Sequence, residues 1–195
     1  MKKIMFTDDL TAAVLEGRKT MTRRLVSERL LEEYSDYDDY VKSVAPADIP
    51  CSRAFEKEFF SSRSYYKPDE VIAVAQRYSE LDHRTFPVFV FEAGAYRKTR
   101  ETHGWNNKQA VQACLMPHQI RITNVRVERL QDISEEDCLK EGVITNGVLF
   151  YVKGEGIDPY PDGRSAFSSL IDETCGRGTW DSNPWVFVYD FELVK

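Results

Sequence analysis

Four cationic side chains and two hydroxyl groups lie within eight residues near the start of the chain, from Gly17 to Arg24. If this segment is an extended strand, its side chains alternate, with Lys19, Met21 and Arg23 on one side and Arg18, Thr20, Thr22 and Arg24 on the other. Cations are not buried without partners, so part of the segment is expected to line a polar cleft or the surface. The alternative is a solvated basic turn with no chemical role.

The preceding residues give a structural reason for a cation at Lys19. Asp8 or Asp9 can cap a helix whose apolar stripe is formed by Leu10, Ala13 and Val14. Gly17 then provides the left-handed residue that ends the helix. Lys19 therefore follows a helix C-terminus, where the helix dipole mildly favours a positive charge.

A second helix is expected to place a carboxylate where one is disfavoured. Ser134 can cap this helix, Asp137 occupies its third position and Gly142 ends it. Glu141 then lies at the C-terminus, where the helix dipole opposes a negative charge. Such a carboxylate needs a compensating cation, and Lys19 is the residue that we expect to supply it.

These segments resemble the ASCH domain family, whose members are small β-barrels related to the RNA-binding PUA domains. The signature Gly-x-Lys-Thr-x-Thr-x-Arg is matched by Gly17, Lys19, Thr20, Thr22 and Arg24, and the segment 134–142 is similar to a later helix of that family. Met116-Pro117 before Arg121-Ile-Thr, and the tail from Trp180, are similar to larger members found in phage and prophage genomes.

The resemblance implies a site, because the family includes small amidohydrolases that cleave acetylcytidine. Their lysine, threonine and glutamate correspond to Lys19, Thr22 and Glu141. A threonine hydroxyl becomes nucleophilic when a base takes its proton, and a lysine acts as that base only if burial lowers its pKa. A Glu141 carboxylate beside Lys19 opposes that lowering. The expected ligand-binding residues are Gly17, Arg18, Thr20, Arg23, Arg24, Arg121, Trp180 and Asn183, with Arg24 on a carbonyl or phosphate oxygen.

The composition fits a single α+β domain built on a PUA-like β-barrel, with peripheral helices and insertions at about 27–66 and 145–178. The chain has 195 residues, of which 42% are hydrophobic and 30% charged. Its opening residues are too short and too acidic for a signal peptide, so a cytoplasmic protein is expected. Cys51, Cys114, Cys138 and Cys175 are scattered, which indicates reduced thiols and no zinc site, and we expect neither metal nor organic cofactor.

Periodicity and turn residues predict the remaining elements. The expected strands are 71–78, 86–91, 119–130 with a β-bulge between Ile122 and Val125, and 185–193. A hairpin is expected around Asn146-Gly147 and a helix over 166–175, whereas 97–107 reads as a loop. A helix is also expected after Ser52, and the acidic, tyrosine-rich run 34–40 is interpreted as a solvated face.

The uneven distribution of charge permits a local nucleic-acid surface on an acidic protein, and no apolar run is long enough to cross a membrane. The net charge is -6, yet the stretch from Arg97 to Arg129 holds seven bases and two acids. We expect this stretch to share one positive face with the Gly17 to Arg24 segment, and the chain to bind a nucleotide or single-stranded RNA. The first alternative is an amidohydrolase that acts on an acylated nucleoside, and the second is a phage-related assembly protein. The oligomeric state is left open.

Overall fold

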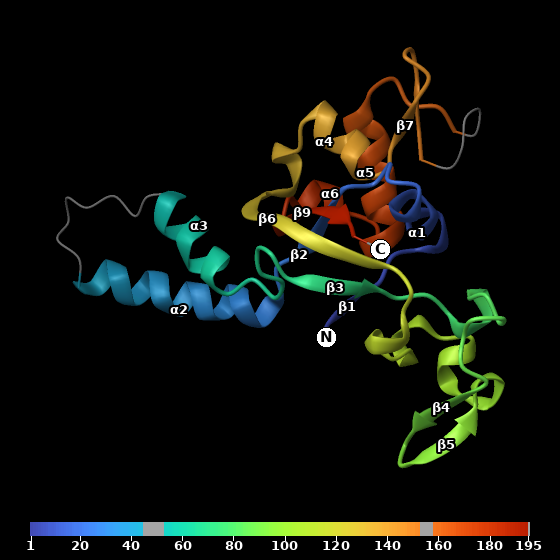
Figure 1. The fold of residues 1–195 in the computed structure, drawn as a ribbon. Coiled ribbons are helices and arrows are strands. Elements are labelled where there is room, and N and C mark those ends of the chain that lie inside the picture. The colour runs from blue at the N-terminus through green and yellow to red at the C-terminus, as the bar shows by residue number, and fades with distance from the viewer. Residues whose placement is uncertain (45–52, 153–157, 195) are drawn as a thin grey trace.

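The computed structural model describes residues 1–44, 53–152 and 158–194, with the side chains of 53–55 also excluded (Figure 1). Cys51, one of the four expected thiols, lies outside these ranges. Within the described residues no helix is both long and apolar enough to cross a membrane.

A five-stranded sheet organises the fold, in the strand order β1-β3-β6-β9-β2. The two shortest strands at one side, β1 and β3, are parallel, and every other neighbouring pair is antiparallel. The strands are β1 (Lys3–Ile4), β2 (Met21–Leu25), β3 (Val71–Val74), β6 (Gln119–Arg129) and β9 (Trp185–Leu193). The register between β6 and β9 shifts between Ile122 and Asn124, so the expected β-bulge is confirmed.

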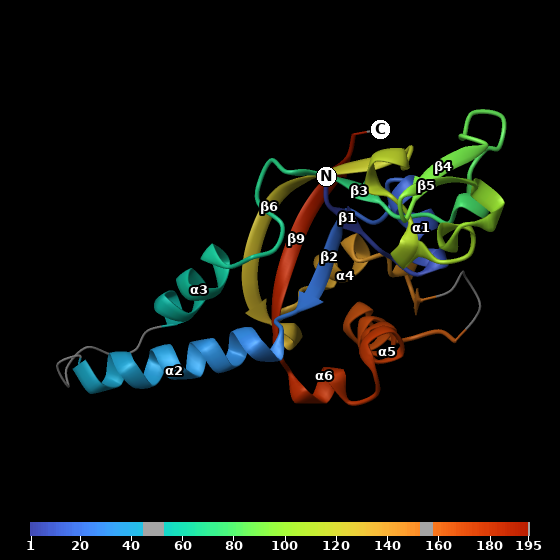
Figure 2. The same cartoon turned by 90° about the horizontal axis from the view of Figure 1, so that it is seen from below.

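Two hairpins and several helices surround this sheet (Figures 1 and 2). The hairpins are β4 (Phe89–Glu92) with β5 (Ala95–Lys98), and β7 (Ile144–Thr145) with β8 (Phe150–Tyr151). The helices are α1 (Asp8–Leu15), α2 (Glu28–Val44), α3 (Arg53–Ser62), α4 (Glu135–Lys140), α5 (Gly163–Cys175) and α6 (Thr179–Ser182). Short 3-10 turns connect β5 to β6.

The alternation of β9 divides the core into two parts, one on each face of the sheet. Phe187 and Tyr189 belong to a core that also contains Phe6 and, from α3, Phe59 and Phe60. Val186 and Val188 face the opposite core, which is formed mainly with residues of α4 and α5. The continuous apolar run of β9 is therefore explained by burial on both faces.

The mixed α+β class is confirmed, but the described strands do not close into a barrel. β1 and β2 are the two edges of the sheet, and β1 has only two residues. The Arg24 guanidinium donates to the Met5 carbonyl across this opening, at 2.5 Å. A side chain therefore lies where a closed barrel would have a ladder of backbone hydrogen bonds.

Helices α2 and α3, which belong to the segment expected as the first insertion, project from the sheet as an arm (Figure 2). None of the α2 residues is fully buried, which agrees with a solvated acidic face. Tyr34 and Tyr37 nevertheless pack on Phe59 of α3, with ring centroids 5.2 Å apart in both cases. The helix expected after Ser52 is present as α3.

The region between β3 and β6 differs most from the sequence expectation. The strand predicted over 86–91 begins only at Phe89, and the predicted loop over 97–107 contains the end of β5. Ala93 and Gly94 both have positive φ, 50° and 84°, as the central residues of a type I′ hairpin turn require. An Ala-Gly turn is a weaker signal than the Asn146-Gly147 turn, whose hairpin is confirmed as β7 and β8.

Candidate functional site

A buried ion pair joins the ends of α1 and α4, 122 positions apart in the sequence. Gly17 ends α1 with a φ of 74°, and Gly142 follows α4 with a φ of 105°. Lys19 Nζ donates to the Glu141 Oε2 at 2.6 Å and to the Glu141 carbonyl oxygen, also at 2.6 Å. Lys19 is 2% exposed and Glu141 3%. The pairing expected from the two helix ends is therefore present.

Arg23 is a second buried cation on the same carboxylate. Its Nη1 lies 3.1 Å from the Glu141 Oε1, so each carboxylate oxygen faces a different cation. Its Nη2 contacts Glu128 at 2.5 Å and Asp137 at 3.0 Å. The Arg23 Nε is buried and has no hydrogen-bond partner among the described residues. Since Arg23 already faces three carboxylates, little of its charge is left for a ligand.

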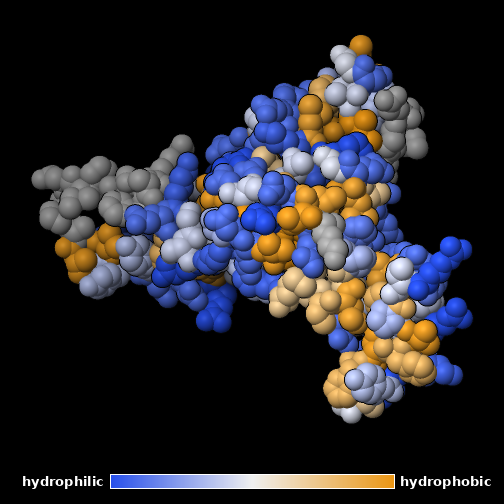
Figure 3. Space-filling view, in the orientation of Figure 1, coloured by the Kyte–Doolittle hydropathy of each residue, from blue (hydrophilic) through white to orange (hydrophobic). Residues whose placement is uncertain are grey.

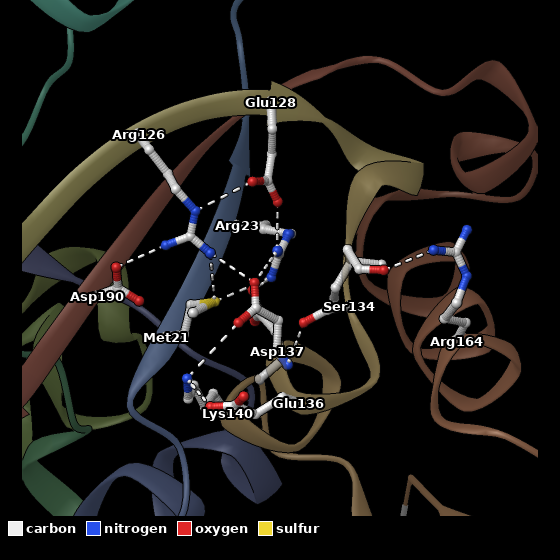
Figure 4. Close-up of polar contacts among 12 residues, drawn as sticks. Met21, Arg23, Arg126, Glu128, Ser134, Glu136, Asp137, Lys140, Arg164 and Asp190 are labelled. Carbon is white, nitrogen blue, oxygen red and sulfur yellow. Dashed lines mark hydrogen bonds and ion pairs between the residues drawn. The ribbon is translucent and has the colours of Figure 1, made fainter.

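The ion pairs continue from Arg23 on β2 to Arg126 on β6, as Figure 4 shows. Arg126 on β6 contacts Glu128 at 3.2 Å, Asp137 at 2.7 Å and Asp190 of β9 at 2.7 Å. Its Nη2 also lies 3.6 Å from the sulfur of Met21. Sequence reasoning missed these members of the network. Their one signal is the Arg126-x-Glu128 pair, which puts two opposite charges on one face of the strand.

Burial sets the direction of the pKa of Lys19. The loss of water lowers this pKa, Glu141 opposes the change, and the nearby cations Arg24 and Arg23 add to the lowering. Burial also acts to lower the pKa of Arg23, but Glu141, Glu128 and Asp137 reverse that effect and raise it. Of these two buried cations, Lys19 is therefore the one that loses its proton more readily.

Thr22 lies on the opposite face of β2 from Met21. It pairs with Tyr189 of β9 and is 4% exposed, so it borders the core that contains Phe6. Lys19 Nζ is 5.8 Å from the centre of the Phe6 ring, and the Arg24 guanidinium is 5.4 Å from it. Lys19 and Arg24 thus reach the same ring, whereas the hydrogen bonds of Lys19 go to Glu141 and not to Thr22.

The chain matches no family model, no curated protein and no solved structure in the comparisons.

Helix α6, which contains Trp180 and is followed by Asn183, lies at the other end of the sheet from the start of β2 (Figure 2), so these two residues are not in the expected cleft. The Asn183 Oδ1 accepts from the Gln131 backbone, and the Trp180 ring packs on Phe167 at 6.3 Å. These two residues precede β9. Lys19 lies near the opposite end of β9, because it comes just before Met21, which pairs with Asp190. The nine residues of β9 span roughly 30 Å and separate the two groups.

The other expected ligand-binding residues are only partly gathered. Thr20 is adjacent to the pair, since its backbone N–H donates to the Lys140 carbonyl at 3.0 Å. Arg18 is exposed, pairs with Glu16 at 2.6 Å and lines a cavity of about 340 Å³ together with Gly142. Arg121 lies on β6 and is 3.6 Å from Glu192, two strands from β2.

The expectation of one shared positive face is wrong. Arg126 contacts the motif directly, but three carboxylates surround it. Arg97 and Lys98 belong to β5, in a hairpin that projects away from β2 (Figure 1). The basic residues that are close in sequence are therefore separated because β5 and β6 belong to different sheets. In the described part of the chain, no three His, Cys, Asp or Glu side chains are arranged so that they could hold a metal ion.

Proposed function

We propose that the protein is an amidohydrolase that acts on an acylated nucleoside, with Lys19, Thr22 and Glu141 as its catalytic groups. The observation that carries this proposal is the burial of Lys19 against Glu141, together with the lowered pKa of the lysine. A lysine whose pKa is lowered gives up its ammonium proton more readily, which a general base requires. The ASCH signature supports the same assignment, and we propose that the sheet is a PUA-like barrel opened between β1 and β2.

The reaction uses water to break the amide bond. The Lys19 amine takes the proton of the Thr22 hydroxyl as its oxygen bonds to the acyl carbon. The carbon–nitrogen bond then breaks, and the leaving nitrogen receives the proton from Lys19 by way of Glu141. Water hydrolyses the acyl-threonine ester, which releases the carboxylic acid and restores the hydroxyl. Arg24 stabilises the charge on the acyl oxygen after it exchanges its hydrogen bond to Met5.

Binding of a nucleotide without turnover is the second candidate. The cavity lined by Arg18 and Gly142 favours it, because its volume of about 340 Å³ lies within the range of small-molecule sites. The motif itself favours it less. Lys19 and Arg23 are buried and paired, so of the four motif cations only Arg18 and Arg24 are accessible to a phosphate.

Release of acetate from acetylcytidine tests the proposal. Thr22→Val removes the hydroxyl at nearly constant volume and is expected to abolish release, as is Lys19→Met, because groups that act as a unit fail together. Thr123→Ala is the matched control, since Thr123 is an exposed strand threonine outside the site. Circular dichroism verifies that each variant is folded.

Turnover by Thr22→Val at the rate of the wild type would contradict the threonine mechanism. A wild-type protein that releases no acetate from acylated nucleosides, but whose measured affinity for cytidine nucleotides falls in Arg18→Ala, would replace the hydrolase proposal with the binding one.

A further inference from the structure

The hairpin of β4 and β5 carries an exposed aromatic surface far from Lys19. Among the described residues it pairs with no other strand, and it projects from the body of the molecule (Figure 1). Phe89 is 53% exposed, Phe91 54% and Tyr96 77%. Rings of this size are normally buried, so their exposure on one short hairpin indicates a surface that binds something.

The register of the hairpin places these rings on one face. Phe91 is paired with Tyr96, and Phe89 with Lys98, while Phe89 and Phe91 are two residues apart on the same strand. Residues directly opposite each other share a face of an antiparallel pair. The exposed face therefore presents three aromatic rings and one ammonium group, here called the aromatic face.

The opposite face anchors the hairpin to the body. Val90 is 3% exposed and packs in the core with Val111 and Met116. The Gln112 side chain donates to the Phe91 carbonyl at 2.5 Å, and the Thr99 N–H donates to Val88 at 2.9 Å. The aromatic face is thus held in place before any ligand arrives, which lowers the entropic cost of binding.

A cavity of about 500 Å³ continues from this face. Lys98 belongs to both, because it lines the cavity and lies opposite Phe89. Trp105 and His83 form one wall, stacked with their centroids 5.2 Å apart, and the Arg100 guanidinium lies 5.7 Å from the Trp105 ring. The cavity has room for a planar heterocycle. Its charged lining consists of Lys98, Arg100 and Glu101, with Glu101 3.9 Å from the Lys98 ammonium.

The charge distribution favours a polyanion at this place. From Asp82 to Ala110 the chain has five bases and three acids, a net charge of +2, whereas the whole chain carries -6. The remaining residues therefore carry -8. The acidic remainder repels a nucleic acid, so the region around the hairpin is where one can approach.

We propose that the aromatic face binds a single-stranded nucleic acid, whose bases stack on Phe89, Phe91 and Tyr96 and whose phosphates contact Lys98 and Arg100. Accessible rings interleaved with cations are suited to unpaired bases, because every base has a face that can stack. A duplex hides these faces. Figure 3 shows apolar and hydrophilic surface side by side on the lobe that contains the hairpin. This inference does not depend on the proposed hydrolase activity.

Fluorescence anisotropy with labelled oligo(U), oligo(dT) and a duplex, each about 12 nucleotides long, tests the proposal on the full chain. Both single strands are expected to bind more tightly than the duplex, and tighter binding of oligo(U) would identify RNA as the ligand. Phe91→Ala and Tyr96→Ala are each expected to weaken binding by about 5-fold to 100-fold. Lys98→Ala is expected to reduce the slope of log affinity against log salt by about 0.7.

Controls separate stacking from damage to the fold. Phe91→Trp keeps a stacking ring and is expected to retain binding, while Tyr40→Ala removes an equally accessible tyrosine from α2 and is expected to change nothing. Lys19→Met is expected to bind like the wild type, so failure of the hydrolase proposal leaves this one standing.

Three results would overturn the inference. They are no binding at about 50 mM salt, equal affinity for duplex and single strand, and unchanged affinity in Phe91→Ala and Tyr96→Ala. Sedimentation velocity tests the alternative that the aromatic face binds a second copy of the chain. Self-association that Tyr96→Ala abolishes, without nucleic-acid binding by the wild type, would assign the aromatic face to an interface between copies.

Discussion

Arg23 Nη1 lies 3.1 Å from the Glu141 Oε1, so the carboxylate that pairs with Lys19 is shared with a second buried cation. The positive charge of Arg23 also disfavours the ammonium form of Lys19 directly. Burial is the largest influence on Lys19 and lowers its pKa. Glu141 opposes this change, whereas Arg24 and Arg23 add to it.

Glu141→Gln is expected to destabilise the protein by about 3 to 5 kcal/mol, because two buried cations lose their common anion. Glu136→Gln is the matched control on the same helix. Its carboxylate is 76% exposed and pairs with Lys140, so a loss below about 0.5 kcal/mol is expected. Urea unfolding measures both values. Similar small losses in the two variants would show that the buried pair contributes little to stability.

The lowered pKa of Lys19 predicts how stability depends on pH. Between this pKa and the value of 10.5 for a free lysine, the unfolded chain binds more protons at this position than the folded chain. The free energy of unfolding must therefore rise with pH across that interval. Lys19→Met is expected to lack this rise.

The difference between the wild type and Lys19→Met at each pH isolates the lysine. Burial raises the pKa of Tyr66 to about 12, which makes stability fall above pH 10, but this contribution is common to both proteins and cancels. A difference that is flat from neutral pH to 10.5 would mean that Lys19 has the same proton affinity in both states.

The Lys19–Glu141 contact could be predicted from sequence because local signals fix both ends of it. Gly17 and Gly142 each end a helix with a left-handed residue, and each places a charge beside a helix terminus. The position of Trp180 could not be predicted in this way. It depends on β9 running between the two ends of the sheet, a property of strand pairing that no local motif contains.

The ion-pair network and the open sheet were missed for a related reason. Arg126 reaches Asp190 because β6 and β9 pair in a register that follows the bulge at Ile122 and Asn124. A bulge is visible in the sequence as a slip in alternation, but the partner residue opposite it is not. Likewise, closure of the barrel depends on the length of β1, and the apolar residues at the start of the chain do not define that length.

Asn183 is expected to have a structural role before β9. It has a φ of 44°, and its Oδ1 accepts from the Gln131 N–H at 2.8 Å. Asn183→Gly loses the hydrogen bond but tolerates the backbone, at a cost of about 1 kcal/mol. Asn183→Ala loses the hydrogen bond and also adopts an unfavourable conformation, so its cost is expected to be about 2 kcal/mol. Thermal or urea unfolding measures both variants, and an Asn183→Ala protein that is more stable than Asn183→Gly would refute this role.

Gly142→Ala should be more damaging than Gly147→Ala, although both glycines have positive φ, 105° and 90°. Each substitution strains the backbone, at a cost of at least about 1 kcal/mol. A β-carbon at Gly142 would in addition lie 3.1 Å from the Leu10 Cδ2 and 3.7 Å from the Lys19 Cδ, while none of the described atoms approaches one at Gly147 within 4 Å. The difference between the two free energies of unfolding therefore measures the packing over Lys19. Equal losses would show that Leu10 moves aside freely, and that the end of α4 does not fix the position of the buried lysine.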